Sequence, residues 1–221
     1  MSGGAGPNTE RTSVGPSRPA PANLLPRLML VTDQDAEDPL TPLVRALTGE
    51  HVDATRVLVQ VRLARWDGVA RRAACQALSD TGAAVVVNDD PALARELNLG
   101  VHLPERAGTV YAARAELSPH ALVGRSCHDA EGLARAEEEG ATYVTLGPVG
   151  AVPHKGAGRG VAWLTRLAQH TSLPVLALGG VSLQDVRPLR DGGVYGVAVM
   201  RAVPGAADPA ELVRTLLDLT R

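Results

Sequence analysis

The sequence contains no phenylalanine, and aromatic residues make up only 2% of its 221 residues. Apolar residues as a class still make up 45% of the chain, so valine, leucine and alanine must fill a core of this size. Cysteine is scarce as well, because Cys75 and Cys127 are the only two. In a chain with cytosolic character, this pair is predicted to stay as two reduced thiols rather than a disulfide.

Three further absences narrow the class of protein. No stretch reaches the roughly 18 consecutive apolar residues that a membrane span needs, and the N-terminus lacks the apolar segment of a secretory signal. The formal net charge is −2, which indicates no basic surface of the kind that binds nucleic acid. We therefore expect a cytoplasmic protein without a membrane or nucleic-acid partner.

The chain divides into a tail and one repetitive segment. Residues 1–26 are rich in glycine, proline, serine and alanine without an apolar period, which predicts a disordered tail. From residue 27 to residue 221, short apolar runs alternate with helix-like stretches, several of which open on an Asp or Ser that can accept free helix N–H groups. The expected strands are 28–32, 57–62, 84–87, 101–103, 122–125, 143–146, 175–178 and 196–200. The expected helices are 38–48, 67–80, 90–97, 110–117, 129–139, 160–170, 182–191 and 208–220.

This alternation predicts the fold class. The apolar runs are continuous, which is typical of parallel strands that are covered on both faces. Eight strands that alternate with eight helices match a single α/β domain of the (β/α)8 type, a TIM barrel. An open, doubly wound sheet is the alternative.

The loops after the last two expected strands have the character of a phosphate site. Gly179 and Gly180 follow the seventh strand, and Met200 and Arg201 follow the eighth. Late βα loops of a barrel commonly bind phosphate through backbone N–H groups, and glycine allows an anion to approach them closely. We expect these four residues to bind a phosphate, although the two glycines alone are also compatible with an ordinary tight turn. The side chain of Arg201 either contacts the phosphate or faces solvent.

Polar residues at the ends of the other strands complete the candidate site. His128 is the candidate acid–base catalyst, because imidazole exchanges protons near neutral pH. Its alternative is a cap on the following helix, and Cys127 beside it is predicted to point into the core. Arg62 has a structural ion pair with Asp33 or Asp89 as its alternative, and His102 is a less favoured candidate for the mouth of the barrel. The substrate-binding candidates are Gln60, Arg62, Asn88, Ser126 and Lys155.

Several motifs, in order over residues 28–215, resemble the thiamin phosphate synthase superfamily, which includes the thiazole tautomerases. They include Leu-Val-Thr-Asp at 30–33, Gln-Val-Arg at 60–62, Gly-Arg-Ser-Cys-His at 124–128 and Leu-Gly-Gly-Val at 178–181. The resemblance implies a β/α barrel that binds a phosphorylated thiazole and is compatible with a homo-oligomer.

The two branches of this superfamily imply different chemistry. A synthase joins a pyrimidine diphosphate to a thiazole phosphate with Mg²⁺, and Asp89 matches its first metal ligand. The second ligand would fall in 104–107, which reads Pro-Glu-Arg-Ala, and the lysine expected at position 64 is alanine. Threonines expected in the loop after the sixth strand are replaced by Val152 and His154.

The tautomerase branch, which aromatises a carboxythiazole phosphate without a metal, has more of its motifs in this chain. They are Leu-Pro at 103–104, Gly-Arg-Ser at 124–126 and the glycine-rich stretch 155–161. We therefore expect an isomerase of the thiazole tautomerase type, in which His128 moves the proton and no cofactor is needed. The alternatives are a synthase, hence a transferase, with Mg²⁺ on Asp89, and a non-catalytic regulatory protein that binds thiazole or thiamin phosphates.

Overall fold

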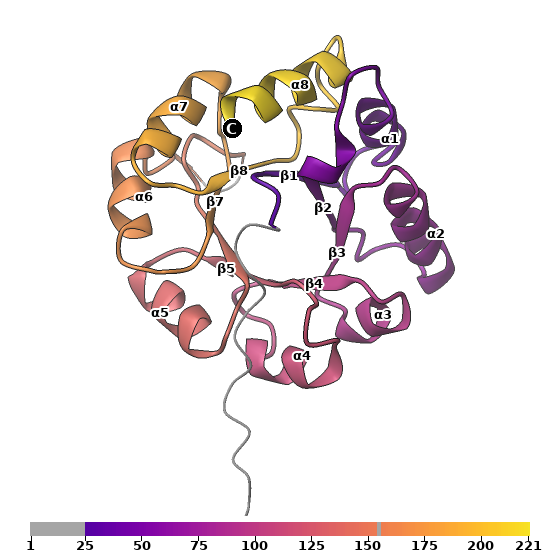
Figure 1. Ribbon diagram of the computed structural model, residues 1–221, viewed down its shortest axis with the longest axis horizontal. Helices are drawn as coiled ribbons and strands as arrows, with labels where there is room; N and C mark the ends of the chain where they lie inside the picture. The colour runs from indigo at the N-terminus through magenta and orange to yellow at the C-terminus, as the bar shows by residue number, and fades with distance from the viewer. Residues whose placement is uncertain (1–24, 154–155) are drawn as a thin grey trace, which may run out of the picture.

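The computed structural model describes residues 25–153 and 156–221. Eight parallel strands form a closed barrel in the order β1 to β8, in which β8 pairs with β1. The helices form a ring around this barrel (Figure 1). The predicted (β/α)8 barrel is confirmed, and the open sheet is wrong. The tail predicted for residues 1–26 lies outside the described residues up to residue 24 and stays a prediction.

The observed elements follow the predicted alternation closely. The strands are Leu28–Val31 (β1), Val57–Val61 (β2), Ala84–Asn88 (β3), Gly100–Leu103 (β4), Val123–Cys127 (β5), Tyr143–Leu146 (β6), Val175–Leu178 (β7) and Gly196–Val199 (β8). The α-helices are Thr41–Leu47 (α1), Gly68–Ser79 (α2), Pro91–Glu96 (α3), Val110–Glu116 (α4), Ala130–Glu138 (α5), Val161–Ala168 (α6), Leu183–Asp191 (α7) and Pro209–Leu219 (α8). A 3₁₀ helix, Ala54–Arg56 (η2), precedes β2 and was not predicted.

Aspartates set the first residue of several helices, as predicted. In each case the carboxylate accepts a hydrogen bond from a backbone N–H in the first helical turn. These N-caps are Asp67, Asp90, Asp129 and Asp208. Helix α1 begins later than expected, because Asp38 precedes Pro39, which disfavours a helical backbone at residue 38. The Asp38 carboxylate instead accepts from the N–H groups of Leu40 and Thr41, and the helix begins at Thr41.

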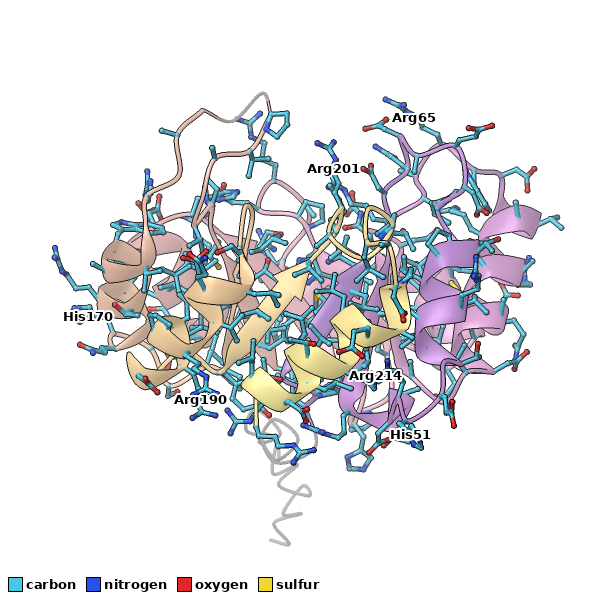
Figure 2. All side chains as sticks on the ribbon, turned by 90° about the horizontal axis from the view of Figure 1, so that it is seen from above. His51, Arg65, His170, Arg190, Arg201 and Arg214 are labelled. Carbon is cyan, nitrogen blue, oxygen red and sulfur yellow. The ribbon has the colours of Figure 1, made fainter. Side chains whose placement is uncertain are left out.

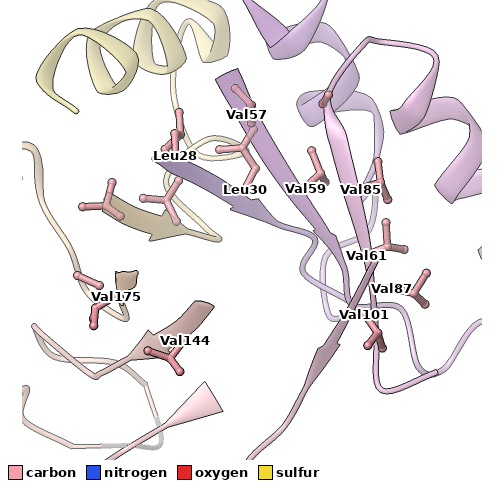
Figure 3. Close-up of a cluster of buried hydrophobic side chains, with 14 of the residues drawn as sticks. Leu28, Leu30, Val57, Val59, Val61, Val85, Val87, Val101, Val144 and Val175 are labelled. Atoms are coloured by element: carbon pink, nitrogen blue, oxygen red, sulfur yellow. The ribbon is translucent and has the colours of Figure 1, made fainter. Parts of the chain in front are cut away.

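Successive residues of each strand face opposite sides of the barrel wall. Leu28 and Leu30 face the helices, together with the valines and leucines labelled in Figure 3. Met29 and Val31 face the interior, where Tyr143 is the largest fully buried side chain. This alternation lets aliphatic residues build the main core, and in β2 to β6 the last inward position is occupied by a polar side chain.

In the part of the chain that the structure describes, no helix has the length and apolar character of a membrane span.

Candidate functional site

A cavity of about 540 Å³ opens at the C-terminal ends of the strands, a size typical of small-molecule sites. Figure 2 shows Arg65 and Arg201 at this end of the barrel and His51 and Arg214 at the opposite end. The floor is built from inward-facing strand residues. The polar members of the floor are Gln60, Asn88, His102, Ser126 and Thr145.

The four residues predicted to bind phosphate lie together at one side of this cavity. Gly179 and Gly180 adopt φ angles of 88° and 65°, in the left-handed region that glycine adopts without strain. Among the described residues, the backbone N–H groups of Gly180 and Arg201 have no hydrogen-bond partner, and the same holds for Val181 and Ala202. Unpaired amides that converge in this way suit an anion. Phosphate binding itself stays a prediction.

Close contact between two loops explains why these positions are glycines. The N–H of Gly150, after β6, donates to the carbonyl of Gly179 at 2.9 Å. A Cβ atom on Gly180 would lie only 2.6 Å from the carbonyl carbon of Gly150. The tight turn and the unpaired amides are therefore features of one and the same loop.

Two guanidinium groups line the cavity on either side of β1. Arg201 donates to Asp33 at 2.9 Å, so its side chain is tied to the end of β1 rather than free in solvent. Partial burial raises the pKa of Asp33, but the hydrogen bonds from Arg201 and the Asp35 N–H and the positive charges of Arg201 and Arg62 outweigh it, so its net pKa is lowered.

Arg62 differs from Arg201, because its guanidinium has no hydrogen-bond or ion-pair partner within residues 25–153 and 156–221. The alternative of an ion pair with Asp33 or Asp89 is therefore wrong. The backbone at this position is held by a hydrogen bond from the Arg62 N–H to Thr32 Oγ1 at 2.7 Å. Arg62 thus presents an unpaired positive charge to the cavity.

His128 lines the cavity and is held from behind by the backbone. Its Nδ1 lies 2.9 Å from the carbonyl oxygen of Gly147, so Nδ1 carries the proton and Nε2 remains available. Nε2 lies 3.9 Å from the Glu105 carboxylate. The following helix is capped by Asp129, which accepts from the Gly132 N–H, so His128 is not a helix cap.

His102 was underrated from the sequence, because it lies in the cavity floor and is only 1% exposed. Its Nε2 lies 2.9 Å from Ser126 Oγ and its Nδ1 lies 3.1 Å from the Tyr143 hydroxyl. Burial, with the nearby charges of Arg62 and Arg125, lowers the pKa of His102 to about 3. The signal was present in the sequence, since Val101 and Leu103 are apolar and the residue between them must face the interior.

Strand β5 extends to Cys127, two residues beyond the predicted end at residue 125. Arg125 therefore lies inside the strand rather than at its end. This side chain faces away from the cavity and donates to the carbonyls of Gly108 and Glu105, at 2.5 and 2.8 Å. Arg125 therefore holds the loop that carries Glu105. Cys127 is 1% exposed and belongs to the same core cluster as Leu103, so the prediction that it packs in the core is confirmed, and burial raises the pKa of its thiol to about 12.

Among the described residues, Glu105 is the carboxylate that lines the cavity. Residues 25–153 and 156–221 contain no group of three or more His, Cys, Asp or Glu side chains that could hold a metal ion. Asp89 is exposed and outside the cavity lining. Mg²⁺ is commonly held by one or two carboxylates together with waters and substrate phosphates, so the role of Asp89 as a metal ligand stays a prediction. Lys155 lies outside the described residues, and its role stays a prediction.

The closed barrel, with its cavity at the strand ends and its unpaired loop amides, defines a β/α-barrel protein with a small-molecule site. The family described as thiamine monophosphate synthase matches residues 28–203 of the chain. The chain belongs to this family.

Individual relatives agree with this assignment. A thiamine-phosphate synthase of Salinispora tropica is 37% identical over 206 residues, which cover 88% of this chain and 97% of that protein. The thiamine-phosphate synthase of Synechococcus sp. (strain CC9311) is 34% identical over 198 residues, which cover 86% of this chain and 56% of that protein. The match thus spans between 30% and 56% of the length of several of the curated relatives.

Among solved structures, a thiamine phosphate pyrophosphorylase from Pyrococcus furiosus shares the fold. Its TM-score is 0.72 at 23% sequence identity, and the match covers 90% of this chain and 96% of that chain.

The predicted placement in the thiazole tautomerase branch of the superfamily, and with it the predicted isomerase function, is wrong, because these relatives are named thiamine-phosphate synthases. The structure gives a physical reason for the error. Leu103 and Arg125, two of the residues that favoured the tautomerase branch, face the helices rather than the cavity. Pro104 of the same Leu-Pro motif does line the cavity.

The low pKa of His102 predicts a pH dependence of stability. In the unfolded chain this histidine has an ordinary pKa near 6.5, whereas in the fold its pKa is about 3. The unfolded state therefore binds the extra proton as the pH falls below about 6.5, and folded-state stability is lost until the pH approaches the folded value. Between pH 7 and pH 5 the loss from this group is about 2 kcal/mol.

Urea unfolding at pH 7 and pH 5, for the natural protein and for His102→Gln, measures this contribution. The natural protein should lose about 2 kcal/mol more than the variant over this interval. Equal losses in the two proteins would show that His102 is not buried in its neutral form.

Proposed function

We propose that the protein joins a pyrimidine diphosphate to a thiazole phosphate and releases diphosphate, as a thiamine-phosphate synthase. The observation that carries this proposal is the presence of two separate groups of unpaired hydrogen-bond donors in one cavity. The unpaired amides after β7 and β8 suit one phosphate, and the unpaired Arg62 guanidinium after β2 suits a second phosphorylated group. The family assignment and the relative that this chain covers almost completely support the same reaction.

Each element has a task in this condensation. The diphosphate leaves with the electron pair of its bond to the pyrimidine carbon, and the thiazole nitrogen supplies the pair for the new bond. Negative charge therefore grows on the leaving group, where the positive charge of Arg62 stabilises it. The amides of Gly180 and Arg201 hold the thiazole phosphate, so that the nitrogen and the carbon meet as if in one molecule.

The remaining candidates receive supporting roles in this proposal. Gln60, Asn88 and Ser126 hydrogen-bond the substrate rings at the cavity floor. His128, when protonated, donates from Nε2 to the departing diphosphate, with Glu105 as the neighbouring carboxylate. Lys155 is proposed as a further contact with an anionic group. Residues 27–221 are proposed to form the functional unit.

A direct assay tests the reaction. The protein is mixed with the pyrimidine diphosphate and the thiazole phosphate, with and without Mg²⁺, and thiamine phosphate and diphosphate are quantified by chromatography. Equal amounts of the two products that increase with time would support the proposal. Binding of both substrates without any product, under both conditions, would contradict it.

A charge-matched pair of variants tests the role of Arg62. Replacing Arg62 with glutamine should raise the KM for the pyrimidine diphosphate roughly 10-fold, because a charge-assisted hydrogen bond to phosphate is lost. Arg65→Gln removes the same charge at the same end of the barrel (Figure 2), but Arg65 is 70% exposed and already paired with Asp35. It should leave the KM within about 2-fold of the natural value. Equal effects of the two variants would argue against a diphosphate contact at Arg62.

A further inference from the structure

A chain of four hydrogen-bonding side chains runs from the barrel interior to the cavity floor. The Tyr143 hydroxyl lies 3.1 Å from His102 Nδ1, and His102 Nε2 lies 2.9 Å from Ser126 Oγ. The Thr145 hydroxyl donates to Ser126 Oγ at 3.4 Å. Tyr143 is completely buried and His102 nearly so, whereas Ser126 and Thr145 also line the cavity. We call this set the interior chain.

The tyrosine fixes the direction of the first hydrogen bond. Among the described residues, His102 Nδ1 is the only partner of the Tyr143 hydroxyl. If Nδ1 carried a proton, the hydroxyl hydrogen of Tyr143 would have no acceptor in the apolar barrel interior, which is unfavourable. A neutral histidine has one donor and one acceptor nitrogen. The Tyr143 O–H therefore donates to Nδ1, and Nε2–H donates to Ser126.

This direction determines what Ser126 offers to a ligand. A serine hydroxyl has two acceptor positions and one hydrogen. Its acceptor positions are taken by His102 Nε2–H and by the Thr145 hydroxyl. With Thr145 as the donor of that hydroxyl pair, the hydrogen of Ser126 has no other acceptor among the described residues, and Ser126 lines the cavity. Ser126 is thus left as a hydrogen-bond donor.

We propose that the Tyr143–His102 pair fixes Ser126 as a hydrogen-bond donor, so that the cavity floor selects a ligand ring atom with a free lone pair. An unprotonated ring nitrogen or a carbonyl oxygen satisfies Ser126, whereas a ring N–H or C–H does not. Tyr143 and His102 act here as positioning residues. The identity of the ring as a pyrimidine rests on the proposed function, but the direction of the hydrogen bonds does not.

The first test needs no substrate. Nitrogen-15 NMR of histidine-labelled natural protein reports which imidazole nitrogen carries the proton, and the His102→Gln variant assigns the signal. The expected result is a protonated Nε2 and an unprotonated Nδ1. A protonated Nδ1 would overturn the proposal whatever the enzyme activity.

The second test measures selectivity. The probes are the pyrimidine diphosphate and analogues in which one ring nitrogen is replaced by C–H, a change that removes a lone pair and keeps the shape. The natural protein should bind one nitrogen-containing probe about 10-fold more tightly than its C–H analogue. Ser126→Ala and Tyr143→Phe should reduce this ratio to about 2-fold or less, with an unchanged affinity for inorganic phosphate.

Tyr111→Phe makes the same chemical change as Tyr143→Phe at a site that is 75% exposed, and it should retain the natural selectivity. Full selectivity in Tyr143→Phe would overturn the proposal, and so would full selectivity in Ser126→Ala if the tyrosine variant does not fold. Selectivity for nitrogen without any condensation would leave the interior chain supported and refute the proposed reaction alone.

Discussion

Replacing Gly180 with alanine is expected to weaken the binding of inorganic phosphate and of the phosphorylated thiazole roughly 10- to 100-fold. Two effects act together at this position. The φ angle of 65° is strained for any residue with a Cβ atom, and the new methyl group would lie 2.6 Å from the carbonyl carbon of Gly150. The loop must therefore move, and the unpaired amides of Gly180 and Val181 lose their common orientation. Losing one or two charge-assisted hydrogen bonds accounts for this range.

Titration calorimetry with phosphate measures this effect, and Gly82→Ala is the matched control. Gly82 has a φ of 88° but nothing within 4 Å of its Cβ position, so this substitution introduces strain without a clash. It should cost about 1 kcal/mol of stability and leave phosphate affinity unchanged. Natural affinity in Gly180→Ala would place the phosphate elsewhere in the cavity.

A second large effect is expected at Gly124, where alanine should destabilise the fold by about 3 kcal/mol or more. A Cβ atom at this position would lie 2.1 Å from Cζ of Tyr143 and 2.4 Å from its hydroxyl oxygen. Both residues face the barrel interior, where the tyrosine ring is completely buried and has no room to withdraw. Urea unfolding monitored by circular dichroism measures the change.

Two further variants identify the cause of this destabilisation. Gly68→Ala is the control, because Gly68 begins α2 and nothing lies within 4 Å of its Cβ position. It should be neutral or slightly stabilising. Adding Tyr143→Leu to Gly124→Ala should recover part of the lost stability, since the smaller side chain leaves space for the methyl group. If the two substitutions are simply additive, contact with Tyr143 is not the cause.

The fold was predictable because local and global signals agree. Apolar runs marked every strand, and aspartates such as Asp67 and Asp208 marked helix starts that the structure confirms. The alternation of side chains along each strand also predicts which face of the barrel wall each residue occupies. It places His102 in the interior and Arg125 outside it. The error over the family branch came in part from giving weight to Leu103 and Arg125, which lie on the outer face.

The pairings between elements distant in sequence were not predictable in the same way. The ion pair between Asp33 and Arg201 spans 168 residues, and the contact between His102 and Tyr143 spans 41. Each depends on strand register, between β8 and β1 for the first pair and across β5 for the second, and a single sequence does not specify this register. The sequence shows that these positions are polar or charged, but it does not show which of them pair in the fold.

The pairing of β8 with β1 has a consequence for how binding competence arises during synthesis. Asp33 and Arg62 leave the ribosome early, whereas the amides after β7 and β8 come from the last part of the chain. A nascent chain therefore holds the two halves of the anion-binding cavity apart until the final strand joins the first. Such long-range closure is slow compared with local helix formation. With the phosphate site proposed above, phosphate would bind only molecules whose ring is complete, and phosphate in a refolding buffer should therefore favour closed molecules over open ones.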